Sequence, residues 1–457
     1  MMSGEELLLK RENGYKNISG SDKAEMEAYC EGYMRFLNDS RIEREFVKNA
    51  IALAEENGFI AYKPGMPLTA GSKIYYNNRG KALILAVMGK KDLDCGAMIA
   101  GAHIDSPRLD LKPIPLFENS ELCYLKTHYY GMVKKYQWPA IPLELHGTIA
   151  LKNGETIDVK IGREPGDSKF TITDLLPQMA NEQVKKSLAD GFDGEQLNIL
   201  SGSIPDAESG KIKLAVLKLL HEKYGITEED FLSAELMAVP AFEVSELGFD
   251  RSMIGGYGHD DRVCAYAELK ALMEAEDPEY TCVCLFADKE ESGSMGVTGM
   301  QSRAYESFMS DLCESRGVAL RRCFENSFCL SADVCAAYDP NYSDAYEKNN
   351  AAYLNHGIAI AKYTGSGGKY GTSDASAETV AKVRKLFAEG GVVWQLTEGG
   401  RIDLGGGGTI AKYVSVRNIE AIDAGVPVLS MHSPFEVVGK FDCYMTYKGI
   451  KALFAND

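Results

Sequence analysis

The sequence predicts an α/β protein in which a mixed, largely parallel sheet is flanked by helices and a β-rich domain is inserted into the chain. Three observations predict this class. Apolar, strand-like runs alternate with segments of helical spacing in the second half of the chain, which is typical of a parallel sheet with helices on both faces. Residues 96–104 are almost wholly apolar, as expected of a strand covered on both sides. After Pro107 these patterns of strands and helices give way to clustered prolines and to the alternating apolar and polar residues of a hairpin.

The first hundred residues are predicted to form two helices followed by two strands. Residues 21–37 and 39–54 have helical spacing, and Gly58 is suited to stop the second helix. The apolar runs over 82–88 and 96–104 are predicted strands. The expected helix caps are Ser21 and Asp22 for the first helix and Asp39 and Ser40 for the second.

The middle of the chain is predicted to be the inserted domain. Residues 143–162 alternate between apolar and polar around Asn153-Gly154, which is the preferred sequence for a type I′ hairpin turn. A polar, charge-rich stretch follows over 190–211. We therefore assign residues 108–240 to an inserted β-rich domain. Residues 1–107 and 241–457 then form one discontinuous domain. The prolines that mark the change of texture are Pro113, Pro115, Pro139 and Pro142.

The last two hundred residues return to alternation of strands and helices, which places the parallel part of the sheet here. The predicted strands are 280–287, 326–332, 358–363, 392–396 and 426–430, and the predicted helices are 260–276, 376–388 and 439–454.

Composition excludes several classes of function. The 457 residues carry a formal net charge of −17 and a sequence pI of about 5.0, so nucleic acids and anionic membrane surfaces are poor partners. No apolar stretch approaches the roughly 20 residues that a membrane-spanning helix needs, and the first ten residues lack the pattern of a secretory leader. The 11 cysteines are odd in number and have no repeating spacing, which favours reduced thiols. We therefore expect a cytoplasmic protein.

Side chains that can bind metals follow four of the apolar runs. In open α/β sheets, ligands bind beyond the carboxyl ends of the strands, so we expect these side chains to meet at one edge. Each has a plainer interpretation when taken alone: a histidine after a strand is usually a hydrogen-bonded residue, and Asp260-Asp261 suits a helix N-cap. Their joint occurrence favours a metal site. The residues are His103 and Asp105, then Asp288, Glu290 and Glu291, then Asp333, then His432, with Asp260 at a helix start.

Imidazole and carboxylate groups suit zinc, manganese or cobalt. A two-metal site needs a carboxylate shared between the ions, further terminal ligands and a free carboxylate as base, and these residues supply each. Asp105, two residues after His103, can accept the second ring N–H of that histidine and hold its tautomer.

The same segments resemble the aspartyl aminopeptidases and the vacuolar aminopeptidase I type, which are two-metal zinc aminopeptidases of peptidase clan MH. The resemblance covers nearly the whole chain, including the length and position of the insert. The strings that carry it are Ala102-His103-Ile104-Asp105-Ser106-Pro107, Gly258-His259-Asp260-Asp261-Arg262, Asp288-Lys289-Glu290-Glu291-Ser292-Gly293-Ser294, Ser331-Ala332-Asp333-Val334, Asp339-Pro340-Asn341-Tyr342 and Ser430-Met431-His432-Ser433.

The resemblance implies a role for each residue. One metal would be bound by His103, Asp260 and Asp333, and the other by Asp260, Glu291 and His432. Glu290 would be the general base, and Asp105 would orient His103. Lys362 is the best match to a lysine that binds an acidic substrate side chain in relatives, although a solvated lysine is the plainer interpretation. Gly407 and Gly408 belong to a glycine run, 405–408, in which the backbone can approach a substrate closely.

The sequence therefore predicts a metal-dependent aminopeptidase that removes the N-terminal residue of peptides, acidic (Asp or Glu) or neutral, through water activated by two metal ions. The expected cofactors are two divalent ions per subunit, Zn²⁺ before Co²⁺ or Mn²⁺. The resemblance also implies a homo-oligomer, a tetrahedral dodecamer with dimer contacts through the insert. Relatives place a histidine of the insert near a Leu-Pro segment, which here is Leu175-Leu176-Pro177-Gln178. The alternatives are a deacylase acting on another amide and a catalytically silent binding module.

Overall fold

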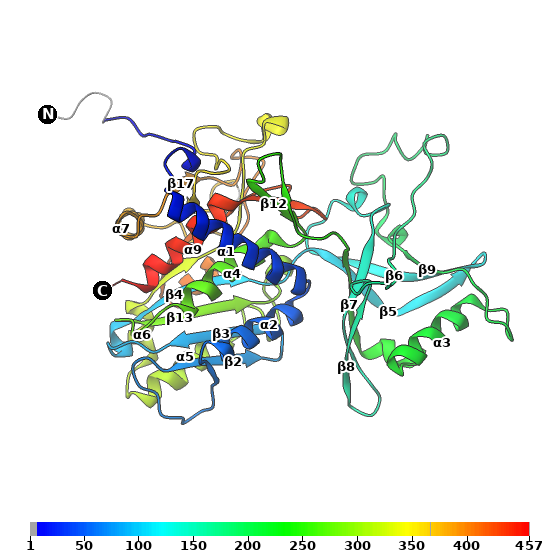
Figure 1. The fold of residues 1–457 in the computed structure, drawn as a ribbon, viewed down its shortest axis with the longest axis horizontal. Coiled ribbons are helices and arrows are strands. Elements are labelled where there is room, and N and C mark those ends of the chain that lie inside the picture. The colour runs from blue at the N-terminus through cyan, green and yellow to red at the C-terminus, as the bar shows by residue number, and fades with distance from the viewer. Residues whose placement is uncertain (1–6, 366, 457) are drawn as a thin grey trace.

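The computed structural model describes residues 7–365 and 367–456 (Figure 1). The expectation that the chain starts without a leader rests partly on residues 1–6, and these lie outside the described residues. One part of the chain contains a large sheet with helices around it, and the residues from β5 (Arg108–Asn119) to β10 (Ala234–Pro240) form a second body beside it (Figure 1). The predicted class, a mixed and largely parallel sheet flanked by helices, is confirmed by the described fold.

The large sheet has nine strands in the order β1-β2-β3-β13-β4-β14-β18-β16-β17. Its centre, from β13 to β18, is parallel, whereas β2, β3 and β16 introduce antiparallel pairings. The strands are β1 (Ile60–Ala61), β2 (Lys73–Asn78), β3 (Ala82–Val87), β4 (Ala97–His103), β13 (Thr281–Ala287), β14 (Phe328–Ser331), β16 (Ile358–Ala361), β17 (Trp394–Thr397) and β18 (Glu420–Gly425).

Helices cover both faces of this sheet, because its central strands are apolar on both sides. One core includes side chains of α1, α2, α4, α7 and α9, and the other includes those of α5, α6 and α8. None of the helices in the described ranges is long and apolar enough to span a bilayer. The helices are α1 (Gly20–Asp39), α2 (Glu43–Glu56), α4 (His259–Met273), α5 (Ala304–Ser315), α6 (Leu320–Asn326), α7 (Ala377–Glu389), α8 (Ala411–Ser415) and α9 (Lys440–Phe454).

The second body is a six-stranded sheet in the order β8-β7-β10-β5-β6-β9, with α3 packed on it. Its hydrophobic core is drawn from residues between Leu109 and Ala238, so this sheet has a core of its own. The elements are β5 (Arg108–Asn119), β6 (Leu122–Tyr130), β7 (Leu143–Ala150), β8 (Thr156–Ile161), β9 (Ile199–Gly202), α3 (Ile212–Tyr224) and β10 (Ala234–Pro240).

Two details of this body differ from the sequence prediction. The hairpin between β7 and β8 exists, but its turn is not type I′, because that type requires positive φ at both central residues. Here Gly154 alone of the Asn153-Gly154 pair has positive φ (86°), and its N–H bonds to the Leu151 carbonyl at 2.8 Å, as in a longer loop. Helix α3 was not predicted, although Gly225 ends it in the left-handed conformation that marks helix C-termini.

A third sheet of five strands, β11-β12-β20-β19-β15, corrects another expectation. The predicted strand over 426–430 is β19, and it belongs to this small sheet. The neighbouring strand of the large sheet is β18, which ends just before it at Gly425. His432 therefore approaches from a different sheet than His103. The strands are β11 (Ser245–Leu247), β12 (Met253–Gly256), β15 (Cys335–Ala336), β19 (Pro427–Leu429) and β20 (Glu436–Gly439).

The first two helices begin elsewhere than predicted. Ser19, not Ser21 or Asp22, caps α1, and its side chain accepts the Asp22 N–H at 3.0 Å. Helix α1 extends to Asp39, and Ser40 is its C-cap. These two residues therefore do not cap the next helix, and α2 begins after Ile42. Short 3-10 helices complete the fold: η2 (Gly14–Lys16), η3 (Leu93–Cys95), η4 (Lys135–Gln137), η5 (Gly194–Gln196), η6 (Glu228–Ser233), η7 (Glu290–Ser292) and η8 (Pro340–Ala345).

Glu268 on α4 is a buried carboxyl that provides a test of this packing. Its side chain is fully buried, and within the described ranges neither of its oxygens has a hydrogen-bond partner. Burial raises the pKa of Glu268 well above its usual value, so the folded protein keeps a proton that the unfolded chain releases. Because the unfolded carboxyl loses its proton above its ordinary pKa of 4.5, folding stability should fall as pH rises from there toward the raised pKa.

We expect Glu268→Met to remove this pH dependence and to stabilise the protein at pH 8 by about 1–3 kcal/mol, the cost of an unsatisfied buried polar group. At pH 4.5, where both states hold the proton more equally, the gain should be much smaller. Denaturant unfolding of both proteins at the two pH values, at equal metal loading, measures the difference. An equal gain at both pH values would show that the folded and unfolded states bind the same number of protons at this carboxyl, so that folding does not raise the pKa of Glu268.

Candidate metal centre

A cavity of about 480 Å³ lies beyond the carboxyl ends of the parallel strands β4, β13, β14 and β18. The structure brings together here the six side chains proposed from the sequence as ligands or base, which enter from separate strand ends and from the start of α4. Those six are His103, Asp260, Glu290, Glu291, Asp333 and His432.

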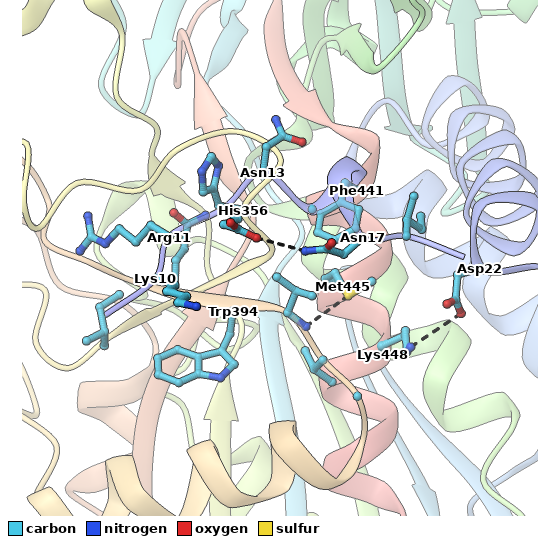
Figure 2. Close-up of a pocket in the computed structure, with 18 of the residues that line it drawn as sticks. Lys10, Arg11, Asn13, Asn17, Asp22, His356, Trp394, Phe441, Met445 and Lys448 are labelled. Atoms are coloured by element: carbon cyan, nitrogen blue, oxygen red, sulfur yellow. Dashed lines mark hydrogen bonds and ion pairs between the residues drawn. The ribbon is translucent and has the colours of Figure 1, made fainter. Parts of the chain in front are cut away.

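A second cavity, of about 490 Å³, lies elsewhere and has a different lining (Figure 2). The N-terminal segment around Asn13 and Asn17 crosses α9 there, and Trp394 of the edge strand β17 closes one side. Its ion pair joins Lys448 to Asp22 at 4.0 Å. Neither of the two candidate ligand groups within the described ranges contributes to this lining, so the chemistry belongs to the first cavity.

Asp260 stands between the two histidines of the metal centre. Its Oδ1 is 3.1 Å from His103 Nε2, and its Oδ2 is 3.1 Å from His432 Nε2. Asp333 Oδ1 lies 3.9 Å from His103 Nε2, and Glu291 Oε1 lies 3.5 Å from His432 Nε2. In each of the two groups, the potential ligand atoms all lie within 4.8 Å of one another. The two groups therefore share the Asp260 carboxylate.

Both histidines are oriented by main-chain carbonyls. His103 Nδ1–H donates to the carbonyl of Asp105 at 3.0 Å, and His432 Nδ1–H donates to the carbonyl of Met132 at 3.1 Å. With the proton on Nδ1, each Nε2 presents a lone pair toward Asp260. Nitrogen and oxygen about 3 Å apart here need a metal ion or a proton between them. Burial opposes protonation of His432, but its hydrogen bond to Asp260 raises the pKa of His432 to about 10, so a proton takes this place when no metal is bound.

The donor set fits divalent ions on a second observation. Asp260 Oδ1 and Glu291 Oε1 are buried and accept no hydrogen bond from the described part of the chain. Burial and neighbouring carboxylates, Asp260 among them, raise the pKa of Glu291 well above its usual value. So many buried acidic groups in one place are unfavourable without compensating positive charge. Nitrogen and carboxylate oxygen ligands are those that zinc binds in proteins.

Glu436 holds the main chain of two candidate ligands, and sequence reasoning missed it. Its buried carboxylate accepts the N–H of His432 at 2.7 Å and the N–H of Asp260 at 3.1 Å. This one side chain of β20 therefore connects the small sheet to the start of α4. The signal in the sequence is weak: a glutamate that opens a short apolar strand four residues after His432.

Asp105 has a wider set of contacts than predicted. Its carboxylate lies 3.5 Å from His103 Nδ1, farther than its own carbonyl. It accepts instead the N–H of Glu290 at 3.1 Å, the N–H of Glu291 at 3.2 Å and the hydroxyl of Tyr130 at 2.7 Å. Asp105 is thus placed to hold the backbone of the predicted base, and its hold on the histidine comes mainly through the main chain.

The loop that carries Glu290 and Glu291 is a tight turn after β13. Lys289 has positive φ (66°), as has Gly293 (91°), and the Ser294 N–H returns to the Lys289 carbonyl at 2.6 Å. Positive φ outside glycine is uncommon and often marks functional sites. The turn directs Glu290 and Glu291 toward the cavity at the carboxyl ends of the strands. Burial raises the pKa of Glu290 above its usual value, which suits a proton acceptor near neutral pH.

The predicted substrate-binding residues separate into two sets. Gly407 and Gly408 line the cavity. Lys362 does not, because side chains alternate along β16 and its extension. Ala359, Ala361 and Tyr363 line the cavity, so Lys362, which is exposed, points to the other face. Lys369, in the loop after β16, is also exposed, and it pairs with Asp374 at 3.1 Å. The lysine that lines the cavity is Lys412 of α8, which sequence reasoning missed because nothing in its pattern distinguishes it.

Comparison with known proteins identifies the family of this chain. The model of the family described as Aminopeptidase I zinc metalloprotease (M18) matches residues 36–454. A probable M18 family aminopeptidase 1 of Clostridium acetobutylicum is 44% identical over 99% of this chain and 99% of its own length. A protein of the same description from Thermotoga maritima is 45% identical over 94% of this chain and 96% of its own length.

Solved structures also match over almost the whole chain. The crystal structure of the M18 family aminopeptidase from Thermotoga maritima has a TM-score of 0.94 and 43% identity, covering 98% of this chain and 99% of that one. Aminopeptidase I from Clostridium acetobutylicum gives 0.92 and 42%, covering 98% and 100%. The S. cerevisiae mApe1 dodecamer gives 0.77 at 21% identity, covering 94% and 97%, which shows a shared fold. The chain therefore belongs to the M18 family and is a metalloaminopeptidase.

Proposed function

We propose that the chain removes the N-terminal residue of peptides at a site for two divalent metal ions, with Glu290 as the general base. The observation that carries this proposal is the placement of Asp260, each of whose carboxylate oxygens lies 3.1 Å from a different histidine Nε2. A carboxylate shared in this way is the bridge that a two-metal site requires.

The proposed ligands are His103, Asp260 and Asp333 for one ion and Asp260, Glu291 and His432 for the other. Zinc is the proposed metal, in keeping with the family description. Two ions held there would supply Lewis acidity to the scissile carbonyl and to the attacking water.

Glu290 is the proposed proton acceptor because it lines the cavity and belongs to neither group of ligands. It takes a proton from the attacking water and delivers it to the amine of the leaving peptide. Asp105 keeps Glu290 in place through the main chain, at 3.1 Å from its N–H. The free α-amine of a peptide substrate is attracted to the acidic side chains at one end of the cavity. This attraction favours cleavage of the first peptide bond of the substrate.

We propose that the cavity prefers neutral N-terminal side chains. Its inner wall is made of small apolar residues of β16 and β18, namely Ala359, Ala361 and Ala424, and Lys362 lies on the opposite face of the strand. Lys362 therefore supplies no acidic preference here. Lys362→Ala should change kcat/KM on Leu and Asp substrates by the same factor. A fall in kcat/KM on the Asp substrate alone would show that Lys362 does bind the substrate side chain. Lys412 of α8 lines the same cavity beside Gly408, so Lys412→Ala on Leu and Asp substrates shows whether this cation selects acidic side chains.

One experiment tests the activity and separates it from the alternatives. Metal-stripped enzyme is assayed on a panel of aminoacyl substrates with zinc, cobalt or manganese added back. We expect activity to return with added metal, to favour neutral residues and to vanish when the α-amine is acetylated. Cleavage of N-acyl amino acids would favour a deacylase, and metal binding without turnover on any substrate would favour a silent binding module.

We further propose that residues 108–240 form an inserted domain through which copies of the chain associate. The six-stranded sheet lies within these bounds and has its own core. Its surface exposes large apolar side chains at Leu175, Leu176 and Met179. The mApe1 relative of the same fold is a dodecamer, and we propose a homo-oligomer of that size here, with tetrahedral symmetry. Light scattering of the purified chain measures its mass.

A further inference from the structure

One residue of the cavity lining, Met132, comes from the region of the inserted six-stranded sheet rather than from the large sheet. Strand β6 ends at Tyr130, and the next two residues, Gly131 and Met132, contact the metal centre. Met132 lines the cavity together with His103, Asp260 and His432. This segment belongs to none of the motifs that the sequence singled out, and the proposed chemistry does not use it.

Three contacts hold the segment in place. The Tyr130 hydroxyl donates to Asp105 Oδ2 at 2.7 Å, and its ring packs under the guanidinium of Arg108 at 4.0 Å. The Met132 carbonyl accepts the Nδ1–H of His432 at 3.1 Å. The contacts of Tyr130 with Asp105 and of Met132 with His432 tie the segment to the metal centre, and these two contacts fix the backbone of Met132 relative to it.

Gly131 lets the segment pass this close. Its φ of +74° is favoured by glycine. A Cβ at this position would lie 3.3 Å from both Cβ and Oε2 of Glu291 and 3.4 Å from the Cα of Pro107. The backbone therefore runs directly against one candidate ligand before Met132 enters the cavity.

The side chain of Met132 lies at the mouth of the cavity. It is 77% exposed although it is apolar. The small residues of the inner wall are buried, Ala359 and Ala424 each to 1% exposure. A peptide with its N-terminal side chain against the inner wall must leave through the mouth. The residue after the scissile bond then passes beside Met132.

We propose that Met132 is a specificity-determining residue for the second residue of the peptide and that it selects apolar side chains there. This inference rests on the proposed function, because it takes the scissile bond to lie at the two ligand groups. A methionine side chain is unbranched and polarisable, so it adapts to apolar groups of different shape. When a second apolar side chain covers Met132, apolar surface of both side chains is removed from water, which is favourable.

The test compares peptide amides that share an N-terminal Leu and differ in the second residue: Leu, Phe, Gly or Asp. For the wild type we expect kcat/KM to be about tenfold higher with Leu or Phe than with Gly, the usual scale for one apolar contact. In Met132→Ala this ratio should approach one, because kcat/KM falls on the Leu and Phe substrates. Met132→Lys should reverse the order of Asp and Leu. Metal content is measured for each variant, and it should match the wild type.

Met295→Ala is the matched control, because Met295 is 62% exposed, follows the Glu290 loop and does not line the cavity; it should keep the wild-type ratios. A wild type without preference at the second residue, or Met132 variants that keep it, would overturn the inference. Failure of the proposed function has a different signature, because N-acetylated peptides would then be cleaved as well as free ones by the wild type.

Discussion

Glu290→Gln is expected to lower kcat by about 10²–10⁴-fold, the usual contribution of a positioned general base. The amide keeps the size of the side chain but cannot take the proton of the attacking water. Because Glu290 belongs to neither ligand group, its loss should leave the metal content of the enzyme unchanged. Steady-state kinetics on a Leu substrate and elemental analysis of the same sample measure the two effects.

The neighbouring residue provides the matched comparison. Glu291→Gln removes a candidate ligand, so it should lower metal content and activity together. The pair therefore separates proton transfer from metal binding at adjacent positions of one turn. If Glu290→Gln kept more than about a tenth of the wild-type kcat, another group would have to be the base.

Asp260→Ala is expected to have the second large effect, the loss of both metal ions. Asp260 belongs to both ligand groups, so its removal leaves each ion with one histidine and one carboxylate. Activity should fall by more than about 10²-fold, beyond what the loss of a residue that only supports a ligand costs. His103→Ala should remove one ion, because His103 belongs to a single group.

Asp261→Asn is the control for Asp260. Asp261 is the next residue, it is equally buried, and it belongs to neither group. We expect this variant to keep both ions and most of the activity. Retention of one tightly bound ion by Asp260→Ala would mean that the two groups do not share this carboxylate.

The sequence predicted the α/β sheet, and it singled out the residues that meet at the cavity, because both depend on local pattern. Apolar runs buried on both faces mark β4 and β13, and a polar side chain after such a run lies at the sheet edge. This reasoning was incomplete for His432. It follows a strand of the small sheet, β19, and reaches the same edge because β20 and Glu436 fold it back.

Other residues could not be found from pattern, since their contacts join distant parts of the chain. Tyr130 meets Asp105 across 25 positions, and Met132 meets His432 across 300. For Lys362 the reason is simpler: the strand register decides which face a side chain takes, and a shift of one residue reverses it, so pattern alone did not show that this side chain is exposed outside the cavity lining. The prediction of a type I′ turn at Asn-Gly was wrong because the register of the two joined strands, rather than local preference, determines the turn type.

Two ions that share Asp260 would give the enzyme a metal content that can be counted. The most direct measurement is the number of zinc ions per chain, by elemental analysis, after stripping with a chelator, reloading with zinc and removing unbound metal. We expect two zinc ions per chain in the wild type, one in His103→Ala and none in Asp260→Ala. One ion per chain in the wild type, or two that persist in Asp260→Ala, would contradict this expectation.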